Sequence, residues 1–393
     1  MTDTRRPGSQ ELSFVWHDSI QAFSKEGWDA LARELPSPFL SWDWLRLLEK
    51  SGSASPATGW QPQHLAVYRS GRLTAAAPLF IKTHSDGEFV FDQFWAQLAA
   101  RMHVAYFPKL VGMSPFTPIG AYRFLVDAES DRPGVIRLMG EEIESWCRSN
   151  GIRGCHFQFL DPDWGGELVE SGFTPWVHPG FVWQNEGYES FEQFLAGLKS
   201  SRRKNIKKER RRLAEEGIGV EVFSGQDIQE KHLGWMYGFY ELTNSRYFPW
   251  SCQYLTRDFF LGLTKELKRH LLLLAAFRPG EKRPVGMSML ACKGRKLFGR
   301  YWGGGEGIPF LHFNLCYYEP IDWAIRNGMQ EFDPGMGGEH KLYRGFRLAP
   351  NYSLHKVYDP GFQHVLRLSL QEHNRLQSRR MQELNQSTTP SRA

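Results

Sequence analysis

Hydrophobic and polar positions along the chain repeat with two different periods, one typical of strands and one typical of helices. The stretches 64–82 and 271–293 alternate with a period of two around a turn, which predicts one β-hairpin in each half of the chain. Between 311 and 327 apolar residues recur at helical spacing, and Asn327-Gly328 follows as a C-cap signal. This mixture of hairpins and amphipathic helices predicts an α/β (α+β) protein.

The same order of elements is predicted twice. A helix ending in RSNGI precedes the strand pattern HFQFL in the first half, and a helix ending in RNGM precedes QEFDP in the second. ELVESGF at 167–173 is then matched by KLYRGF at 341–346, each before a further strand. Together with the hairpins, these parallels favour an internal duplication. We predict units at 12–188 and 189–385, the second opening with a basic helix at 195–215.

Composition excludes several classes of protein. The 393 residues are 41% hydrophobic and 14% aromatic, as expected for a globular protein with large cores. The five cysteines contain no CxxC pair, which disfavours a zinc site or a disulfide framework, so no metal is predicted. A net charge of +5 permits a polyanionic partner. The absence of a long apolar run predicts no transmembrane segment, and we expect a cytoplasmic protein.

A run of three glycines follows the predicted strand 297–302. We expect the strand to end or bulge at Gly303, Gly304 and Gly305, because glycine can leave ordinary backbone conformations. A helix is predicted to start just after this run, near His312. Backbone N–H groups at such a place can hold a phosphate or a developing oxyanion.

A second strand is predicted to end at Asp333, before the turn 334–338. The turn presents four polar side chains, Glu339, His340, Lys341 and Arg344. Glu339 or His340 suits a general base, and the two cations, one helical turn apart, suit a phosphate or carboxylate. The simpler alternatives are that Glu339 caps the following helix and that both cations point into solvent.

Several motifs together resemble one family. They are GRYWG at 299–303, PFLHFNLCYY at 309–318, FDPGMGGEHKLYRGF at 332–346 and SPFLSWDWL at 37–45. This combination resembles the FemA/FemB-like branch of the GNAT superfamily, in particular bacterial proteins of peptidoglycan biosynthesis or recognition. The resemblance implies tandem GNAT-like units, each a mixed, mostly antiparallel sheet flanked by helices.

The resemblance implies an N-acyltransferase that moves an acyl or aminoacyl group to a primary amine of a small molecule or peptide, such as a cell-wall precursor. The donor would be acyl-CoA or aminoacyl-tRNA, used as a co-substrate, with no tightly bound cofactor. The usual coenzyme A pyrophosphate loop, Q/R-x-x-G-x-G/A, is absent, because residues 303–307 read GGGEG. Further partners implied are tRNA and, through peripheral contact, an acidic lipid-linked substrate.

Site residues follow from the motifs and the resemblance. The predicted catalytic residues are Glu339, His340, Lys341 and Tyr301. The predicted donor-binding residues are Gly303, Gly304, Gly305, Arg300, His312 and Arg344. The predicted substrate or polyanion contacts are Asp333 and, from the basic run KSSRRKNIKKERRR, Arg202, Arg203 and Lys204. In the first half, Asp92, Trp95, His103 and Tyr106 are predicted to line a cleft shared by the two units.

Two other functions are weighed against transfer. A serine hydrolase or a nucleotide-binding enzyme is disfavoured, since neither GxSxG, nor Walker A, nor a strand-linked GxGxxG occurs. A non-catalytic module that binds peptidoglycan-type peptide or RNA through its basic helix is the stronger rival. It predicts that Arg202, Arg203 and Lys204 are essential while Glu339, His340 and Lys341 are replaceable.

Overall fold

A computed structural model describes residues 12–246 and 253–388 of the chain. Its strands are β1 (Leu12–His17), β2 (Trp60–Pro62), β3 (His64–Arg69), β4 (Arg72–Ala77), β5 (Phe80–Lys82), β6 (Lys109–Gly112), β7 (Leu125–Val126), β8 (Gly154–Phe157), β9 (Thr174–Gln184), β10 (Gly219–Ser224), β11 (Leu271–Phe277), β12 (Gly286–Lys293), β13 (Lys296–Gly304), β14 (Glu331–Asp333) and β15 (Arg347–Val357).

The α-helices are α1 (Lys25–Ala32), α2 (Trp42–Lys50), α3 (Gln93–Arg101), α4 (Arg132–Ser149), α5 (Gly166–Glu170), α6 (Phe191–Ala196), α7 (Ser200–Glu215), α8 (Glu230–Arg246), α9 (Arg257–Leu261), α10 (Lys265–Lys268), α11 (Leu311–Phe313), α12 (Glu319–Arg326) and α13 (Pro360–Thr388). A π-helical turn, η4 (Asn314–Tyr318), joins α11 to α12. The 3₁₀ turns are η1 (Ile20–Ala22), η2 (Pro56–Thr58), η3 (Gly225–Asp227) and η5 (Glu339–Arg344).

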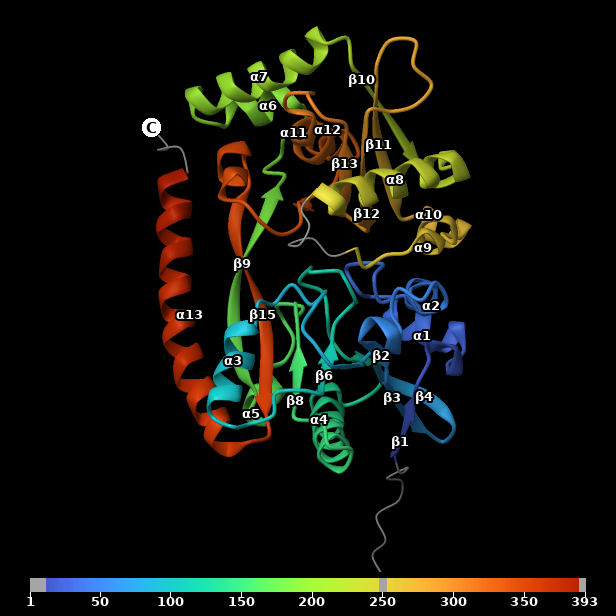
Figure 1. The fold of residues 1–393 in the computed structure, drawn as a ribbon, viewed down its shortest axis with the longest axis vertical. Helices are drawn as coiled ribbons and strands as arrows, with labels where there is room; N and C mark the ends of the chain where they lie inside the picture. Colours follow the sequence, from blue (N-terminus) through green and yellow to red (C-terminus); the bar gives the residue numbers. More distant parts are fainter. Residues whose placement is uncertain (1–11, 247–252, 389–393) are drawn as a thin grey trace, which may run out of the picture.

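The strands form two sheets, flanked by helices (Figure 1). One sheet has the order β1-β3-β4-β7, and the other has the order β10-β11-β12-β13-β14-β9-β15-β8-β6-β5-β2. Most neighbouring strands are antiparallel; the exceptions between named strands are β13 with β14 and β6 with β8. The predicted α/β (α+β) class, with mixed and mostly antiparallel sheets, is confirmed.

The structure repeats one series of elements. Four antiparallel strands, β1-β3-β4-β7 in the first half and β10-β11-β12-β13 in the second, are followed by the helix α4 or α11–α12. Strand β8 or β14 comes next, then a short helical turn and a long strand, β9 or β15. Gly172 and Gly345 precede these long strands, and both have φ of +90°, a conformation that favours glycine. The predicted parallel between the two halves therefore extends to the backbone.

The long strands of the two halves pair with each other in the middle of the eleven-stranded sheet. β9 and β15 pair along nine residues, from Thr174↔His355 to Val182↔Arg347. The last residues of β9 pair with β14, and the last residues of β15 pair with β8. Helix α13 packs along both long strands (Figure 1). The sheet consequently crosses the predicted boundary at residues 188–189 without interruption.

The first half contains an insertion that the second half lacks. Residues 78–120, between β4 and β7, add β5, α3 and β6, and β6 pairs in parallel with β8 through Val111↔His156. Residues 109–112 of this insertion form β6, which lies between β5 and β8 in the sheet. In the second half, β13 and β14 pair only at 296–298 with 331–333 and then separate.

Candidate functional site

The point at which β13 and β14 separate carries an irregularity of the backbone. Tyr301 pairs with Met289 and Gly299 with Leu290, so Arg300 is an extra residue that faces no partner on β12. Such a β-bulge redirects a side chain and is typical of strand edges near active sites. The motif GRYWG thus forms a bulged strand, and its bulged residue Arg300 lies near Asp333 at the end of β14.

Arg300 has buried nitrogen atoms without partners. Within the described residues, its Nε and Nη1 atoms are buried and form no hydrogen bond. The guanidinium carbon lies 5.8 Å from the ring centre of Phe39, and burial lowers the Arg300 pKa, although Tyr301 and the nearby Asp333 carboxylate oppose that shift. Because arginine stays protonated in proteins, these donors require an acceptor. An anionic group would supply it.

The turn at 333–338 is held in place by Lys341. Its Nζ donates to the carbonyl oxygens of Gly335 at 2.6 Å and Met336 at 2.9 Å. The side chain is 2% exposed, and burial lowers its pKa to about 8 although Asp333 opposes the shift. Asp333 Oδ1 accepts from the Gly335 N–H at 2.7 Å, and burial raises the Asp333 pKa while Arg300 opposes that change. Lys341 and Asp333 therefore shape the turn beside Arg300.

His340 belongs to an aromatic cluster with Tyr317 and His312. His340 Nε2 lies 3.1 Å from the Tyr317 hydroxyl, and the His340 and His312 rings are 6.4 Å apart. The His312 ring also packs 4.5 Å from that of Trp302 on β13. Burial, Arg344 and Lys341 lower the pKa of His340. Burial, His340 and the same two cations lower the pKa of His312 to about 4. Both imidazoles are therefore neutral near pH 7, and His340, which is half-buried, can accept a proton.

Arg344 is engaged inside the protein. Its Nη2 donates to both carboxylate oxygens of Glu209, at 2.9 and 3.1 Å, and its Nε donates to the Tyr318 hydroxyl at 2.9 Å. The guanidinium also stacks on Phe313, 3.5 Å from the ring centre. Arg344 thus joins η5 to α7 and to the helix 311–326, and Glu209, which no sequence pattern singled out, is its counter-ion. Lys341 and Arg344 point to different partners, not to one shared anion.

Glu339 and Tyr301 lie apart from this cluster. Glu339 is exposed and pairs with Arg380 of α13 at 2.7 Å, and it forms no cap of η5. Tyr301 donates to the carbonyl oxygen of Phe116, in the first half, at 3.4 Å, and burial raises its pKa. The four predicted catalytic residues therefore do not form one group. Glu339 lies at the surface, His340 and Lys341 lie in η5, and Tyr301 contacts the first half.

The three glycines have a packing role that the sequence did not reveal. Gly303 and Gly304 lie inside β13 with no positive φ, and only Gly305 follows the strand. A Cβ at Gly303 would lie 2.0 Å from the carbonyl oxygen of Phe239 on α8. The glycine lets the helix cross the strand closely, and the strand ends at Gly304, within the run where its end was expected. The N–H of Gly305 donates to Val285 at 2.7 Å, and an oxyanion role for this run stays a prediction.

The basic run forms α7, which is separate from α6. Arg202 donates to the Leu342 carbonyl oxygen at 3.2 Å and Arg203 to that of Ala196 at 3.4 Å, so both contact the protein itself. Lys204 and Lys208 are exposed, lie one turn apart, and form no ion pair with the described residues. Lys204 and Lys208 therefore give α7 exposed positive charge. Of these two lysines, only Lys204 was among the predicted contacts.

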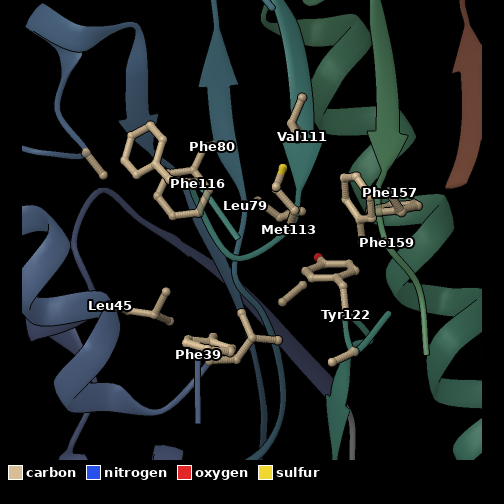
Figure 2. Packing of buried hydrophobic residues seen from close by; sticks show 14 of the residues in the cluster. Phe39, Leu45, Leu79, Phe80, Val111, Met113, Phe116, Tyr122, Phe157 and Phe159 are labelled. Carbon is tan, nitrogen blue, oxygen red and sulfur yellow. The ribbon is translucent and has the colours of Figure 1, made fainter. Parts of the chain in front are cut away.

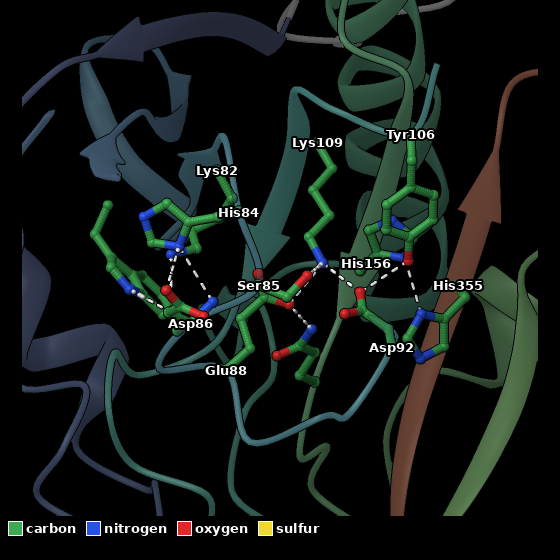
Figure 3. A network of polar contacts seen from close by, with 12 residues as sticks. Lys82, His84, Ser85, Asp86, Glu88, Asp92, Tyr106, Lys109, His156 and His355 are labelled. Atoms are coloured by element: carbon green, nitrogen blue, oxygen red, sulfur yellow. Dashed lines mark hydrogen bonds and ion pairs between the residues drawn. The ribbon is translucent and has the colours of Figure 1, made fainter. Parts of the chain in front are cut away.

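A buried polar network in the first half was not predicted. Lys109 and Glu88 are fully buried, and Lys109 Nζ contacts Glu88 at 2.8 Å, Asp92 at 2.5 Å and Ser85 at 2.9 Å (Figure 3). The Tyr106 hydroxyl donates to Asp92 at 2.8 Å. Asp92 and Tyr106 thus belong to the interior of the first half, as does the buried Trp95, whereas His103 is exposed. No local pattern marks such a network, because its members meet only through tertiary contacts.

Comparisons with known proteins agree with this architecture. The family model described as FemAB-like, peptidoglycan biosynthesis/recognition, matches residues 19–392. The chain belongs to the FemAB-like family. Among solved structures, FemX is similar at 11% identity with a TM-score of 0.54, covering 88% of this chain and 98% of that one. L-PGS from Bacillus licheniformis is similar at 10% identity with a TM-score of 0.51, covering 85% and 97%. No curated protein matches the chain.

Both structural likenesses concern the fold, and membership of the FemAB-like family supports acyl or aminoacyl transfer as the general class of activity. Among the described helices, none is both long enough and apolar enough to cross a bilayer.

Proposed function

We propose that this FemAB-like protein transfers an aminoacyl or acyl group to a primary amine, at the place where β13 and β14 separate. The observation that carries the proposal is that two buried nitrogen atoms of Arg300, at the bulge, have no hydrogen-bond partner among the residues that the structure describes. Transfer of an acyl group creates a negative charge on the carbonyl oxygen, and fixed donors in a site with little water stabilise that charge strongly. Arg300 supplies such donors, or binds an anionic group of the substrate beside the reacting carbon.

His340 is the base we assign to the reaction. The amine nitrogen attacks the carbonyl carbon of the donor, a C–N bond forms, and the C–O or C–S bond to the donor breaks. The proton leaves the attacking nitrogen for His340, and the departing oxygen or sulfur takes up a proton in turn. His340 suits this role because its lowered pKa keeps it neutral, with Tyr317 beside its Nε2. Lys341 and Asp333 act as positioning residues through the turn they hold.

Aminoacyl-tRNA is the donor we favour over acyl-CoA. Coenzyme A proteins commonly bind pyrophosphate through a glycine-rich loop after the strand that corresponds to β13. In this chain that segment carries Glu306, whose negatively charged side chain is 83% exposed and would repel pyrophosphate. Arg246, the nearby cation, is already bonded to the Gly304 carbonyl oxygen at 2.8 Å. Lys204 and Lys208 on α7 offer exposed positive charge for a nucleic-acid backbone. A cell-wall peptide amine is the acceptor that the family description favours.

The test is a transfer assay with each donor separately. The protein is incubated with a peptide that bears a free lysine amine and with one donor at a time: charged tRNA, acetyl-CoA or a longer acyl-CoA. The mass of the peptide is then measured by mass spectrometry. We expect added mass with tRNA, and a fall in kcat/KM of roughly 100-fold or more for R300M and for H340Q. The control is R123M, since Arg123 pairs with Asp161 in the first half. Full activity in R300M and H340Q would refute the site, and mass added only with acyl-CoA would refute the donor.

A non-catalytic binding module is the second candidate. It is favoured by one observation: Glu339, Lys341 and Arg344 are all engaged in contacts within the protein. This alternative predicts no transfer with any donor, together with saturable binding of tRNA or of cell-wall peptide. Binding would then weaken in a K204E/K208E double variant and persist in H340Q.

A further inference from the structure

The insertion at residues 78–120 is held firmly in the first half of the molecule. Figure 2 shows Val111 and Phe116 of this insertion packed among core side chains, and both are buried. Its helix α3 lies against the sheet and against α13. The ring centres of Trp95 on α3 and Trp176 on β9 are 6.2 Å apart, and those of Trp95 and Phe362 on α13 are 6.5 Å apart. One side of α3 is therefore fixed on the protein, and its remaining residues face outward.

Three large apolar side chains of this helix and its flanks are exposed. Phe91 is 71% exposed, Phe94 is 63% exposed and Met102 is 36% exposed. Phe94, Leu98 and Met102 are four residues apart, so they follow one side of the helix, with Leu98 half-buried. We call these four residues, together with Arg101, the outer face of α3. Apolar side chains gathered on one surface mark a contact with a protein or a membrane.

The segment that carries this face exposes no negative charge. Between residues 89 and 108 the only acid is Asp92. Asp92 is 1% exposed, and its carboxylate accepts from Lys109 at 2.5 Å and from Tyr106 at 2.8 Å (Figure 3). Arg101 and His103, by contrast, are exposed. The outer face of α3 therefore combines apolar side chains with basic residues and lacks an exposed carboxylate.

Helix α13 exposes apolar side chains in a different setting. Leu368 and Leu376 are each 52% exposed. The charges along this helix have both signs, as in the exposed Arg375–Glu372 pair at 2.7 Å. Single apolar residues on a surface of mixed charge are normal for a protein in water. The lack of exposed acids thus distinguishes the outer face of α3 from its neighbour.

We propose that the outer face of α3 binds the surface of an anionic lipid bilayer, with Phe91 and Phe94 inserted at the boundary between headgroups and acyl chains. Apolar side chains are stabilised at that boundary, and anionic headgroups attract arginine but would repel exposed carboxylates. The inference does not rest on the proposed function, because it concerns the surface that the protein binds and not the group that it transfers.

The size of the face favours a bilayer over a protein partner. A stable protein–protein interface buries about 800 Å² on each partner. Helix α3 has nine residues, which is roughly 14 Å at 1.5 Å per residue, and the mixed charges of α13 lie beside it. A bilayer requires no such area, since a few inserted side chains and the attraction of a cation give reversible binding.

The experiment measures sedimentation of the full chain with lipid vesicles. One vesicle preparation contains phosphatidylcholine and phosphatidylglycerol in equal parts, and the other contains phosphatidylcholine alone. We expect stronger binding to the first, and weaker binding to it as salt rises from about 0.1 M to about 1 M, because salt screens the headgroup charge. The double variant F91S/F94S should lower the partition coefficient at least about tenfold, and R101Q should lower it roughly fivefold.

The matched control is L368S/L376S, which removes two exposed leucines from α13 and should bind vesicles as the wild-type protein does. Equal binding to the two vesicle preparations, unchanged binding of F91S/F94S, or an equal loss in the control would overturn the proposal. So would a dimer of the wild-type protein in analytical ultracentrifugation that F91S/F94S abolishes, since the face would then bind a second copy of the chain. A thermal melt checks folding, and R101Q gives the answer if F91S/F94S does not fold. Transfer plays no part in this measurement, so its failure leaves the proposed function unaffected.

Discussion

The two halves of the molecule repeat the same series of elements, but they differ in how a buried cation beside their parallel strands is paired. In the first half the inserted strand β6 pairs with β8, and Lys109 on β6 is neutralised by two buried carboxylates. In the second half β13 and β14 separate after Phe298, and two buried nitrogens of Arg300, next to that point, have no partner within residues 12–246 and 253–388. The comparison teaches that one copy of a duplicated fold can neutralise a buried cation with its own carboxylates, while the other copy leaves two guanidinium nitrogens without a partner among the described residues.

The largest effect on stability is expected from the Lys109 network of the first half. Replacing Lys109 with Met leaves Glu88 and Asp92 buried without their cation, which should lower the free energy of unfolding by about 3–5 kcal/mol. Urea denaturation followed by tryptophan fluorescence measures the change. The matched control is K296M at the start of β13, because the Lys296–Glu331 pair lies at the surface with its side chains 42% and 31% exposed, and such a pair is worth about 0–1 kcal/mol. Similar losses in the two variants would show that the network is not a support of the first half.

A smaller effect is expected where α8 crosses the second half. In G303A the new Cβ would meet the Phe239 carbonyl oxygen at 2.0 Å, and the helix must move, at a cost of about 1–3 kcal/mol. In G305A the nearest atom, the Val285 carbonyl oxygen, would be 3.3 Å away, so the control should lose much less. The same denaturation assay compares them. If both variants unfold alike, close packing is not the reason for glycine at 303.

The arginines near the parallel strands should differ by a smaller amount. Arg123 and Asp161 of the first half form an ion pair at 3.4 Å, so R123M should lower the free energy of unfolding by about 1 kcal/mol or less. Nε and Nη1 of Arg300 have no partner to lose, and R300M should leave stability unchanged or raise it slightly. Calorimetric melting of both variants tests this contrast. A larger loss in R300M would mean that Arg300 already has a structural partner.

The smallest effect concerns pH. Burial, Arg344 and Lys341 lower the pKa of His340 below its ordinary value of 6.5. The base is active when neutral, and protonation of the acceptor amine is common to all variants, so the ratio of kcat/KM between the wild-type protein and H340Q should stay nearly constant as pH falls from 8 to 6.5 and shrink only below that range. Paired pH profiles of the wild-type protein and H340Q measure this, with H364Q on α13 as the control variant. A ratio that already shrinks above pH 6.5 would remove His340 from the role of base.

Local patterns led to the fold and to part of the site. The hairpins, the Asn327-Gly328 helix end and the repeated SGF and RGF turns depend on neighbours in sequence, and these predictions agree with the structure. The roles of individual site residues did not follow, since Lys341 and Arg344 meet their partners in the turn 335–336 and on α7. The predicted division at residues 188–189 stays a prediction, although β9 and β15 each pair with strands of the other half.

The sequence by itself determined the family, the fold class and the duplicated order of elements, because periodicity, turn residues and motifs are properties of adjacent positions. Only the tertiary structure decided that Gly303 accommodates a helix, that Nε and Nη1 of Arg300 find no partner in the described part of the chain, and that Lys109 meets Glu88 and Asp92 in the core. Each of these depends on groups that are far apart in the chain and meet only when the sheets assemble, so the charges and hydrogen bonds that define the site are settled by packing.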